Sequence, residues 1–162
     1  MTAHSIYKSP AGERAVMAWY DAALASWPVP YEALNVPTRH GNAFVLASGA
    51  SGKESGTPLI LLHGAGTNSA MWAGDVAAYS PQYRVYAVDL LGEPGKSAPN
   101  RPAWDSPAYA EWLGDVLDAL KIERASLLGL SQGGWTALKF AVYQPRRVES
   151  LVVDLGESII RR

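Results

Sequence analysis

Cysteine is absent from the 162 residues of this sequence, which excludes disulfide bonds and thiolate-bound metals. No apolar stretch approaches the ~18 residues that cross a membrane. Residues 1–10 also lack the apolar centre of a secretory signal. These absences predict a cytoplasmic protein that does not bind membranes.

Excess charge of either sign is missing as well. The sequence has 14 basic and 15 acidic residues, so its formal net charge is −1, and the basic side chains are scattered. Binding to nucleic acid is therefore not predicted. A hydrophobic content of 48% over this length is enough for one globular core.

The N-terminal part of the sequence predicts a helix followed by a hairpin. Apolar side chains recur on one helical face over residues 12–27, and two prolines follow. Residues 31–38 and 43–48 are typical of two strands joined by a turn at 40–42, before a polar loop over 49–57.

From residue 58 onwards, apolar runs alternate with amphipathic runs. The predicted buried strands span residues 58–62, 83–89, 125–130 and 148–155. The predicted helices span residues 70–79, 106–120 (with Ser106 as N-cap and Pro107 in the first helical position) and 132–143.

This alternation indicates an α/β fold. We expect a mostly parallel sheet of about six strands, with an N-terminal hairpin and helices on both faces. The whole chain, residues 1–162, is interpreted as a single domain. Residues 1–30 form its helix and lead-in, and residues 31–162 form its sheet core.

The most informative motif is Gly129-Leu130-Ser131-Gln132-Gly133, which reads G-x-S-x-G between a predicted strand and a predicted helix. That context is typical of a nucleophile elbow, in which a sharp turn exposes a reactive serine. Small residues are needed on both sides of the serine because the helix passes close to the strand. We therefore predict Ser131 as a catalytic nucleophile.

A second motif, His63-Gly64-Ala65-Gly66, follows the strand predicted at 58–62. Chemistry in an open parallel sheet gathers at the carboxyl ends of the strands, so this turn is expected beside Ser131. Attack by a serine on a carbonyl needs backbone N–H donors for the oxyanion that forms. By position, these donors are those of Ala65 and Gln132.

Three stretches of the sequence resemble the α/β-hydrolase family in their order and spacing. They are Leu61–Gly64, Asp89–Ser97 and Gly129–Gly134. On these motifs the chain is similar to the N-terminal part of a bacterial carboxylesterase.

The resemblance implies a serine hydrolase that cleaves small-molecule carboxylic esters through an acyl-enzyme, without a cofactor or metal. It implies a loop-supporting role for His63, Gly64, Gly129 and Gly133. Relatives that open epoxides or displace halide carry Asp at the elbow, so Ser131 favours acyl transfer. The resemblance also implies a cap after the sixth strand and then an acid and a histidine, which this chain is expected to lack.

No histidine follows Ser131 in the sequence. His4 lies near the terminus, His40 is expected on a surface turn far from the carboxyl ends of the strands, and His63 is expected to support its loop. Asp154, at the end of the last predicted strand, is a possible acid for orienting a histidine. Without a base the serine is a weak nucleophile, so we expect this polypeptide alone to hydrolyse esters poorly.

Two alternatives remain open from the sequence. One is a non-catalytic protein that binds a small ligand on a hydrolase scaffold, and the other is an inactive fragment that acts through interactions. The strand at Val148–Leu155 is expected at an exposed sheet edge, where it would favour self-association.

Overall fold

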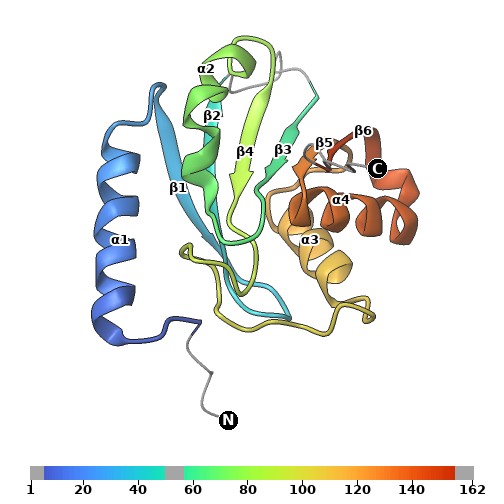
Figure 1. Ribbon diagram of the computed structural model, residues 1–162. Coiled ribbons are helices and arrows are strands. Elements are labelled where there is room, and N and C mark those ends of the chain that lie inside the picture. The colour runs from blue at the N-terminus through green and yellow to red at the C-terminus, as the bar shows by residue number, and fades with distance from the viewer. Residues whose placement is uncertain (1–5, 50–56, 156–162) are drawn as a thin grey trace, which may run out of the picture.

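The computed structural model describes residues 6–49 and 57–155. These residues form one six-stranded sheet in the order β1-β2-β4-β3-β5-β6 (Figure 1). The strands, in chain order, are β1 (Tyr31–Val36), β2 (Ala43–Gly49), β3 (Leu59–Leu62), β4 (Arg84–Val88), β5 (Ala125–Leu130) and β6 (Val148–Asp154).

Five of the six strands run in the same direction. β2 is antiparallel to both of its neighbours, β1 and β4, whereas β4, β3, β5 and β6 pair in parallel. β1 therefore points the same way as the parallel strands, and the carboxyl ends of five strands meet at one edge of the sheet. The loops that leave this edge carry the candidate site.

Helices cover both faces of the sheet, as the sequence predicts. One face carries α1 (Pro10–Ala25), the 3-10 helix η1 (Ser69–Gly74) and α2 (Val76–Tyr79); the other carries α3 (Ala108–Ala119) and α4 (Gln132–Tyr143). A 3-10 turn, η2 (Pro145–Arg147), joins α4 to β6. Within the described ranges, none of these helices has the length and apolar character needed to cross a bilayer.

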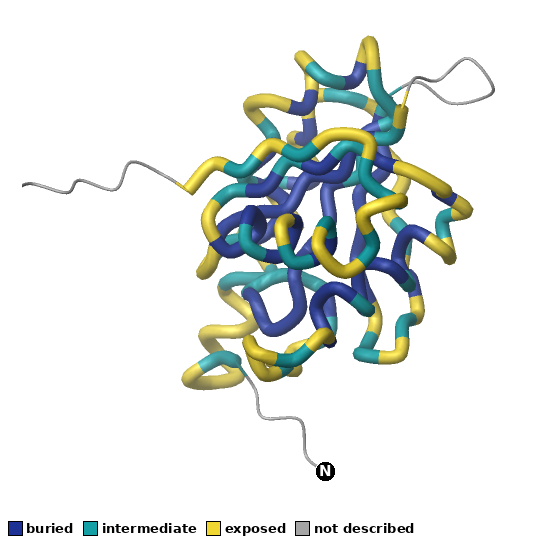
Figure 2. Tube along the Cα trace, turned by 90° about the vertical axis from the view of Figure 1, so that its right-hand side faces the viewer, coloured by how far each residue is buried: buried dark blue, intermediate teal, exposed yellow. Residues whose placement is uncertain are grey.

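The two faces enclose separate apolar cores. Trp112 and Phe140 are fully buried between the sheet and α3 and α4, whereas Tyr20 and Trp72 are buried between the sheet and α1 and η1. Figure 2 shows the buried trace inside and the exposed trace outside. Burying one large apolar side chain contributes about 1.5–3 kcal/mol, so both layers stabilise the sheet. The predicted α/β fold is confirmed.

The ends of the first helix differ from the prediction of residues 12–27. α1 begins at Pro10, two residues earlier than predicted, because the Ser9 hydroxyl oxygen accepts the Gly12 N–H at 3.1 Å and caps the helix there. The helix ends at Ala25. Trp27 is buried beyond the helix end, where its indole N–H donates to the Ser48 hydroxyl at 3.2 Å.

Two further helix predictions need correction. The predicted helix over 70–79 is divided into η1 and the single turn α2, because the Asp75 N–H bonds the Trp72 carbonyl three residues back. The helix predicted from Ser106 begins at Ala108, with Pro107 rather than Ser106 in the capping position. The Ser106 hydroxyl still accepts a long hydrogen bond of 3.4 Å from the Ala108 N–H.

β6 forms one edge of the sheet, and no strand of the described residues pairs with its outer side. Val152 on this strand is 56% exposed. Edge strands with exposed apolar side chains promote pairing between chains. We propose that the β6 edge mediates self-association of this chain.

A charge on β6 tests that proposal. We expect the chain to sediment as a dimer or larger species at high concentration, and Val152→Lys to shift it towards the monomer. Val142→Lys is the matched control, because Val142 is exposed on α4 and is not part of the edge strand. A wild-type chain that sediments as a monomer at every concentration would contradict the proposal.

Candidate active site

Ser131 occupies the turn between β5 and α4, at the edge where the parallel strands end. Its backbone has φ 50° and ψ −111°, a left-handed conformation that is strained for a residue with a side chain. Two backbone hydrogen bonds hold it: the Ser131 N–H donates to the Asp154 carbonyl at 2.6 Å, and the Ser131 carbonyl accepts the Trp135 N–H at 2.9 Å. The residue is exposed, so its hydroxyl faces outward from a fixed turn.

The glycines around Ser131 allow the backbones of β3, β5 and α4 to touch. A Cβ on Gly133 would lie 2.1 Å from the Leu62 carbonyl oxygen, and one on Gly129 would lie 2.4 Å from the carbonyl group of Gly133. A Cβ on Gly134 would meet the Val153 side chain at 2.6 Å. Residues with a side chain do not fit at these positions, so the glycines bring the N-terminus of α4 against the end of β3.

The loop after β3 lies beside the elbow. A Cβ on Gly64 would be 3.8 Å from the Cβ of Ser131. Ala65 follows at an exposed position, and Gly66 adopts φ 72°. Gln132 is the first residue of α4, so its N–H has no acceptor within the helix. The structure therefore brings together the two residues that the sequence predicts as oxyanion donors, Ala65 and Gln132.

His63 is fully buried and its ring is held by the backbone. The Leu90 N–H donates to its Nε2 at 2.8 Å, which requires an unprotonated Nε2, and its Nδ1 bonds the Gly64 carbonyl at 2.8 Å. Burial lowers the pKa of His63 and outweighs the opposing effect of the nearby Asp89 carboxylate. Both nitrogens of the neutral ring are therefore engaged in supporting the loop.

Asp89 directly follows β4 and organises the loop that it begins. Its buried carboxylate accepts the Tyr20 hydroxyl at 2.9 Å, the Ser69 N–H at 2.8 Å and the Lys96 N–H at 2.8 Å. A Cβ on Gly95 would lie 2.4 Å from this carboxylate, so the loop closes directly over it. Burial raises the pKa of Tyr20, and the Asp89 charge adds to that effect.

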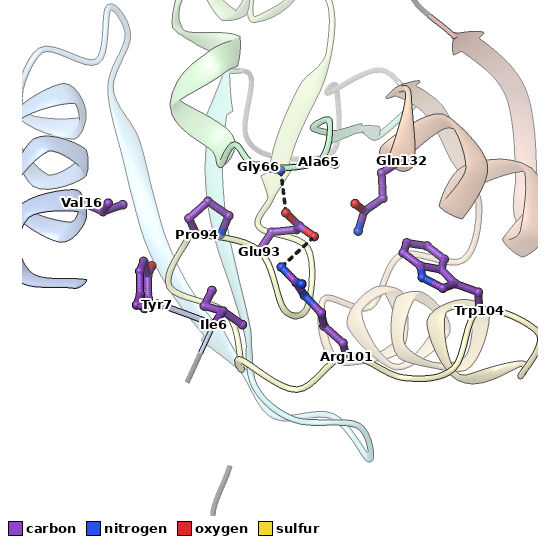
Figure 3. Close-up of a pocket in the computed structure, with 10 residues that line it drawn as sticks. All are labelled: Ile6, Tyr7, Val16, Ala65, Gly66, Glu93, Pro94, Arg101, Trp104 and Gln132. Carbon is purple, nitrogen blue, oxygen red and sulfur yellow. Dashed lines mark hydrogen bonds and ion pairs between the residues drawn. The ribbon is translucent and has the colours of Figure 1, made fainter. Parts of the chain in front are cut away.

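Two adjoining pockets open around the elbow. Ser131 lines a pocket of about 420 Å³ with Trp104, Gln132, Trp135 and Leu155. Ala65 lines a neighbouring pocket of about 510 Å³ (Figure 3). Trp104 and Gln132 belong to both, so the two pockets meet beside the elbow. Trp135 is partly buried against the core under α3 and α4, and it packs edge-on against Trp104 with ring centres 4.6 Å apart.

Sequence reasoning missed three residues of these walls, Glu93, Arg101 and Trp104. The Glu93 side chain is buried, and it accepts the Gly66 N–H at 2.7 Å. Arg101 approaches the same carboxylate at 3.8 Å. All three residues lie in the long loop between β4 and α3, where no periodic pattern marks which side chains turn inward. The only local signal in the sequence that could have identified Glu93 is its position as an acidic residue in a Gly/Pro-rich turn after a buried strand.

The prediction that His40 lies far from the carboxyl ends of the strands is wrong. Its turn joins β1 to β2, and the carboxyl end of β1 lies at the same edge as those of the parallel strands. His40 pairs there with Glu111 of α3, Nε2 to Oε2 at 2.7 Å. It does not line either of the pockets around Ser131 within the described structure.

Asp154 lies at the end of β6, next to the elbow, where its carbonyl accepts the Ser131 N–H. The residue is exposed. Its proposed role as an acid stays a prediction. His4 lies outside the described residues.

Comparison with known proteins places these motifs in a family. The sequence model described as "alpha/beta hydrolase fold" matches residues 57–159, which include both the elbow and the oxyanion loop. Two curated relatives from Bacillus subtilis (strain 168) are carboxylesterase YbfK, 45% identical, and the uncharacterized carboxylesterase nap, 41% identical. Each alignment covers 83% of this chain and 44% of the relative. The chain therefore spans less than half the length of these relatives.

Solved structures give the same result. The crystal structure of carboxylesterase CesB (YbfK) from Bacillus subtilis matches with a TM-score of 0.80 at 42% identity, covering 89% of this chain and 50% of that one. The naproxen esterase (carboxylesterase NP) of the same organism matches with a TM-score of 0.79 at 39% identity, covering 90% and 50%.

The elbow packing predicts a large difference between two glycine substitutions. Gly133→Ala should lower the free energy of unfolding by about 3 kcal/mol or more, because its methyl group would overlap backbone atoms. Gly74→Ala, at an exposed position with no atom within 4 Å of the added Cβ, should change it by less than about 1 kcal/mol. Denaturant unfolding measures both, and similar values would contradict the packing account.

The environment of His63 predicts a pH dependence of stability. Its folded pKa lies below the usual 6.5, so between that folded value and 6.5 the unfolded chain binds more protons than the folded chain. The contribution of His63 to stability should therefore be complete above pH 6.5 and be lost as the pH falls towards the folded pKa. NMR titration of the His63 ring measures the folded value directly. A His63 pKa at or above 6.5 would be inconsistent with the buried neutral ring.

Proposed function

The chain belongs to the α/β-hydrolase family, and from this premise we propose that Ser131 is the nucleophile of a serine hydrolase that cleaves carboxylic esters. One observation carries the proposal. Ser131 is exposed on a strained turn beside a pocket, and the adjoining pocket is lined by both Ala65 and Gln132. The Bacillus relatives are named as carboxylesterases, which supports ester hydrolysis as the reaction class.

The proposed reaction proceeds through an acyl-enzyme. The Ser131 Oγ attacks the ester carbonyl carbon while a base takes its proton, and the carbonyl electrons move onto oxygen. The N–H groups of Ala65 and Gln132 stabilise that oxyanion, each donor by typically about 3 kcal/mol. Collapse of the intermediate expels the alcohol, which takes up the proton. Water then attacks the acyl group in the same manner and releases the carboxylic acid and free Ser131.

The base is proposed to come from outside the described residues. Both nitrogens of His63 are engaged, and His40 pairs with Glu111 away from the pockets. Asp154, next to the elbow, remains the candidate acid for orienting a histidine. The Bacillus relatives are more than twice as long as the segment that this chain matches. This difference in length supports a base that, in the relatives, lies outside the matched segment. We therefore expect weak hydrolysis by these 162 residues alone.

The pockets support a small-molecule ester as the substrate. Ser131 opens to one pocket and Ala65 to the other, so the two parts of an ester have a place on either side of the reacting carbon. Trp104 and Trp135 provide an aromatic wall next to Ser131. Burial of apolar substrate groups against these rings would supply binding energy.

A second candidate function is binding of a small ligand without catalysis. The observation that favours it is the engagement of His63, which leaves Ser131 without a base among the described side chains. A binding protein of this kind would keep the pockets but would show no reactivity at Ser131.

Labelling with a fluorophosphonate distinguishes the two functions. We expect slow labelling at Ser131, accelerated at least about tenfold by added imidazole, which supplies the missing general base. Mass spectrometry locates the label. Ser131→Ala should abolish the labelling. Ser150→Ala is the control and should not affect it, because the Ser150 hydroxyl bonds the Ser126 hydroxyl between β6 and β5.

One result would count against the proposed function, and another against the proposed origin of the base. Absence of label at Ser131 with and without imidazole would favour the binding protein. Fast labelling that imidazole does not change would mean that the chain already holds a base, against the proposed origin of that group.

A further inference from the structure

Two polar side chains face each other across the pocket that contains Ala65. Apolar side chains form much of its wall, including Ile6, Val16 and Trp104. Figure 3 shows the Gln132 amide and the Glu93 carboxylate pointing towards one another below the oxyanion loop. Polar groups placed in this way in an apolar pocket are typical of a site that orients a ligand.

The side-chain amide nitrogen of Gln132 has no hydrogen-bond acceptor among the described residues. The residue is only 9% exposed, and its Nε2 is buried with no acceptor among the described residues. Nearly all buried polar groups in proteins are hydrogen-bonded, so an exception requires an explanation. Because Gln132 lines both pockets, a substrate bound there lies close enough to supply the acceptor.

Glu93 retains capacity to accept hydrogen bonds. Its Oε2 accepts the Gly66 N–H at 2.7 Å, while its Oε1 is 3.8 Å from the Arg101 guanidinium, too far for a hydrogen bond. A carboxylate has about four acceptor positions, so lone pairs remain for a donor from the pocket.

The charges of Glu93 and Arg101 limit which substrate group can bind beside Gln132. An anionic group would be repelled by Glu93, and a cationic group would be opposed by Arg101 on the same wall. A neutral hydroxyl is compatible with both, since it can accept the Gln132 Nε2–H and donate its own proton to Glu93. A carbonyl oxygen would satisfy Gln132 but leave the Glu93 Oε1 without a donor.

We propose that Gln132 and Glu93 form a subsite for a substrate hydroxyl, so that the preferred substrates are esters that carry a hydroxyl group close to the scissile bond. This inference rests on the proposed ester hydrolysis at Ser131. It gives Gln132 two separate functions: its backbone N–H faces the oxyanion, and its side chain selects the substrate.

Matched pairs of esters test the subsite. Butyrate and 3-hydroxybutyrate esters of one alcohol place the hydroxyl on the acyl side; propyl and 2,3-dihydroxypropyl esters of one acid place it on the alcohol side. We expect the hydroxylated member of one pair to be favoured at least about tenfold in kcat/KM, because a site built for a hydroxyl discriminates against its absence. The pair that shows the preference identifies the side.

Substitutions then assign the preference to the two residues. Gln132→Met keeps the side-chain length without the amide, and it should reduce the ratio within the preferred pair to near one. Glu93→Gln, which removes the charge and keeps an oxygen acceptor, should lower the ratio less. Gln82→Met, at an exposed glutamine, is the control that should leave the ratio unchanged. Hydrolysis without a hydroxyl preference, or a preference that survives Gln132→Met, would overturn the subsite while leaving the proposed function intact.

A binding measurement decides the matter if no ester is hydrolysed. The side-chain amide signals of Gln132 should shift in NMR spectra on addition of either methyl 3-hydroxybutyrate or glycerol, and shift less with methyl butyrate or 1-propanol. Equal or absent shifts within both matched pairs would overturn the subsite independently of catalysis.

Discussion

The contact between Gly133 and the carbonyl group of Leu62 determines how the candidate site is assembled. A Cβ at Gly133 would overlap that oxygen at 2.1 Å, so only glycine lets the first turn of α4 touch the end of β3. This backbone contact joins the elbow on β5 to the loop that follows β3. Ser131, Gln132 and Ala65 thereby become neighbours although two strands, two α-helices and a 3-10 helix separate them in the sequence.

A second layer of hydrogen bonds holds the oxyanion loop from the other side. His63, Gly66 and Ser69 are bonded, in order, to the Leu90 N–H, the Glu93 carboxylate and the Asp89 carboxylate. All three partners belong to the loop after β4. These hydrogen bonds join the loop after β3 to the loop after β4. A buried network whose groups are bonded in this way holds both loops in one conformation. The Nε2 of Gln132 differs, because its partner is not found among the described residues.

The sequence predicted the features that depend on local signals. The apolar runs gave the strands, and G-x-S-x-G between strand and helix gave the elbow at Ser131. The features that it did not predict depend on contacts between distant segments. Glu93 meets Gly66 27 positions away, and Trp104 meets Trp135 from a loop without periodicity. The position of His40 was missed because it follows from two successive antiparallel pairings, which no local pattern reveals.

The central claim is that Ser131, Ala65 and Gln132 act together on one ester carbonyl. The most direct measurement is a crystal structure of the chain after reaction with a phosphonate that mimics the tetrahedral intermediate. The account predicts phosphorus bonded to the Ser131 Oγ, with one phosphonyl oxygen about 2.7–3.1 Å from the backbone nitrogens of both Ala65 and Gln132. A phosphonyl oxygen that contacts neither nitrogen, or an adduct on a different residue, would contradict it.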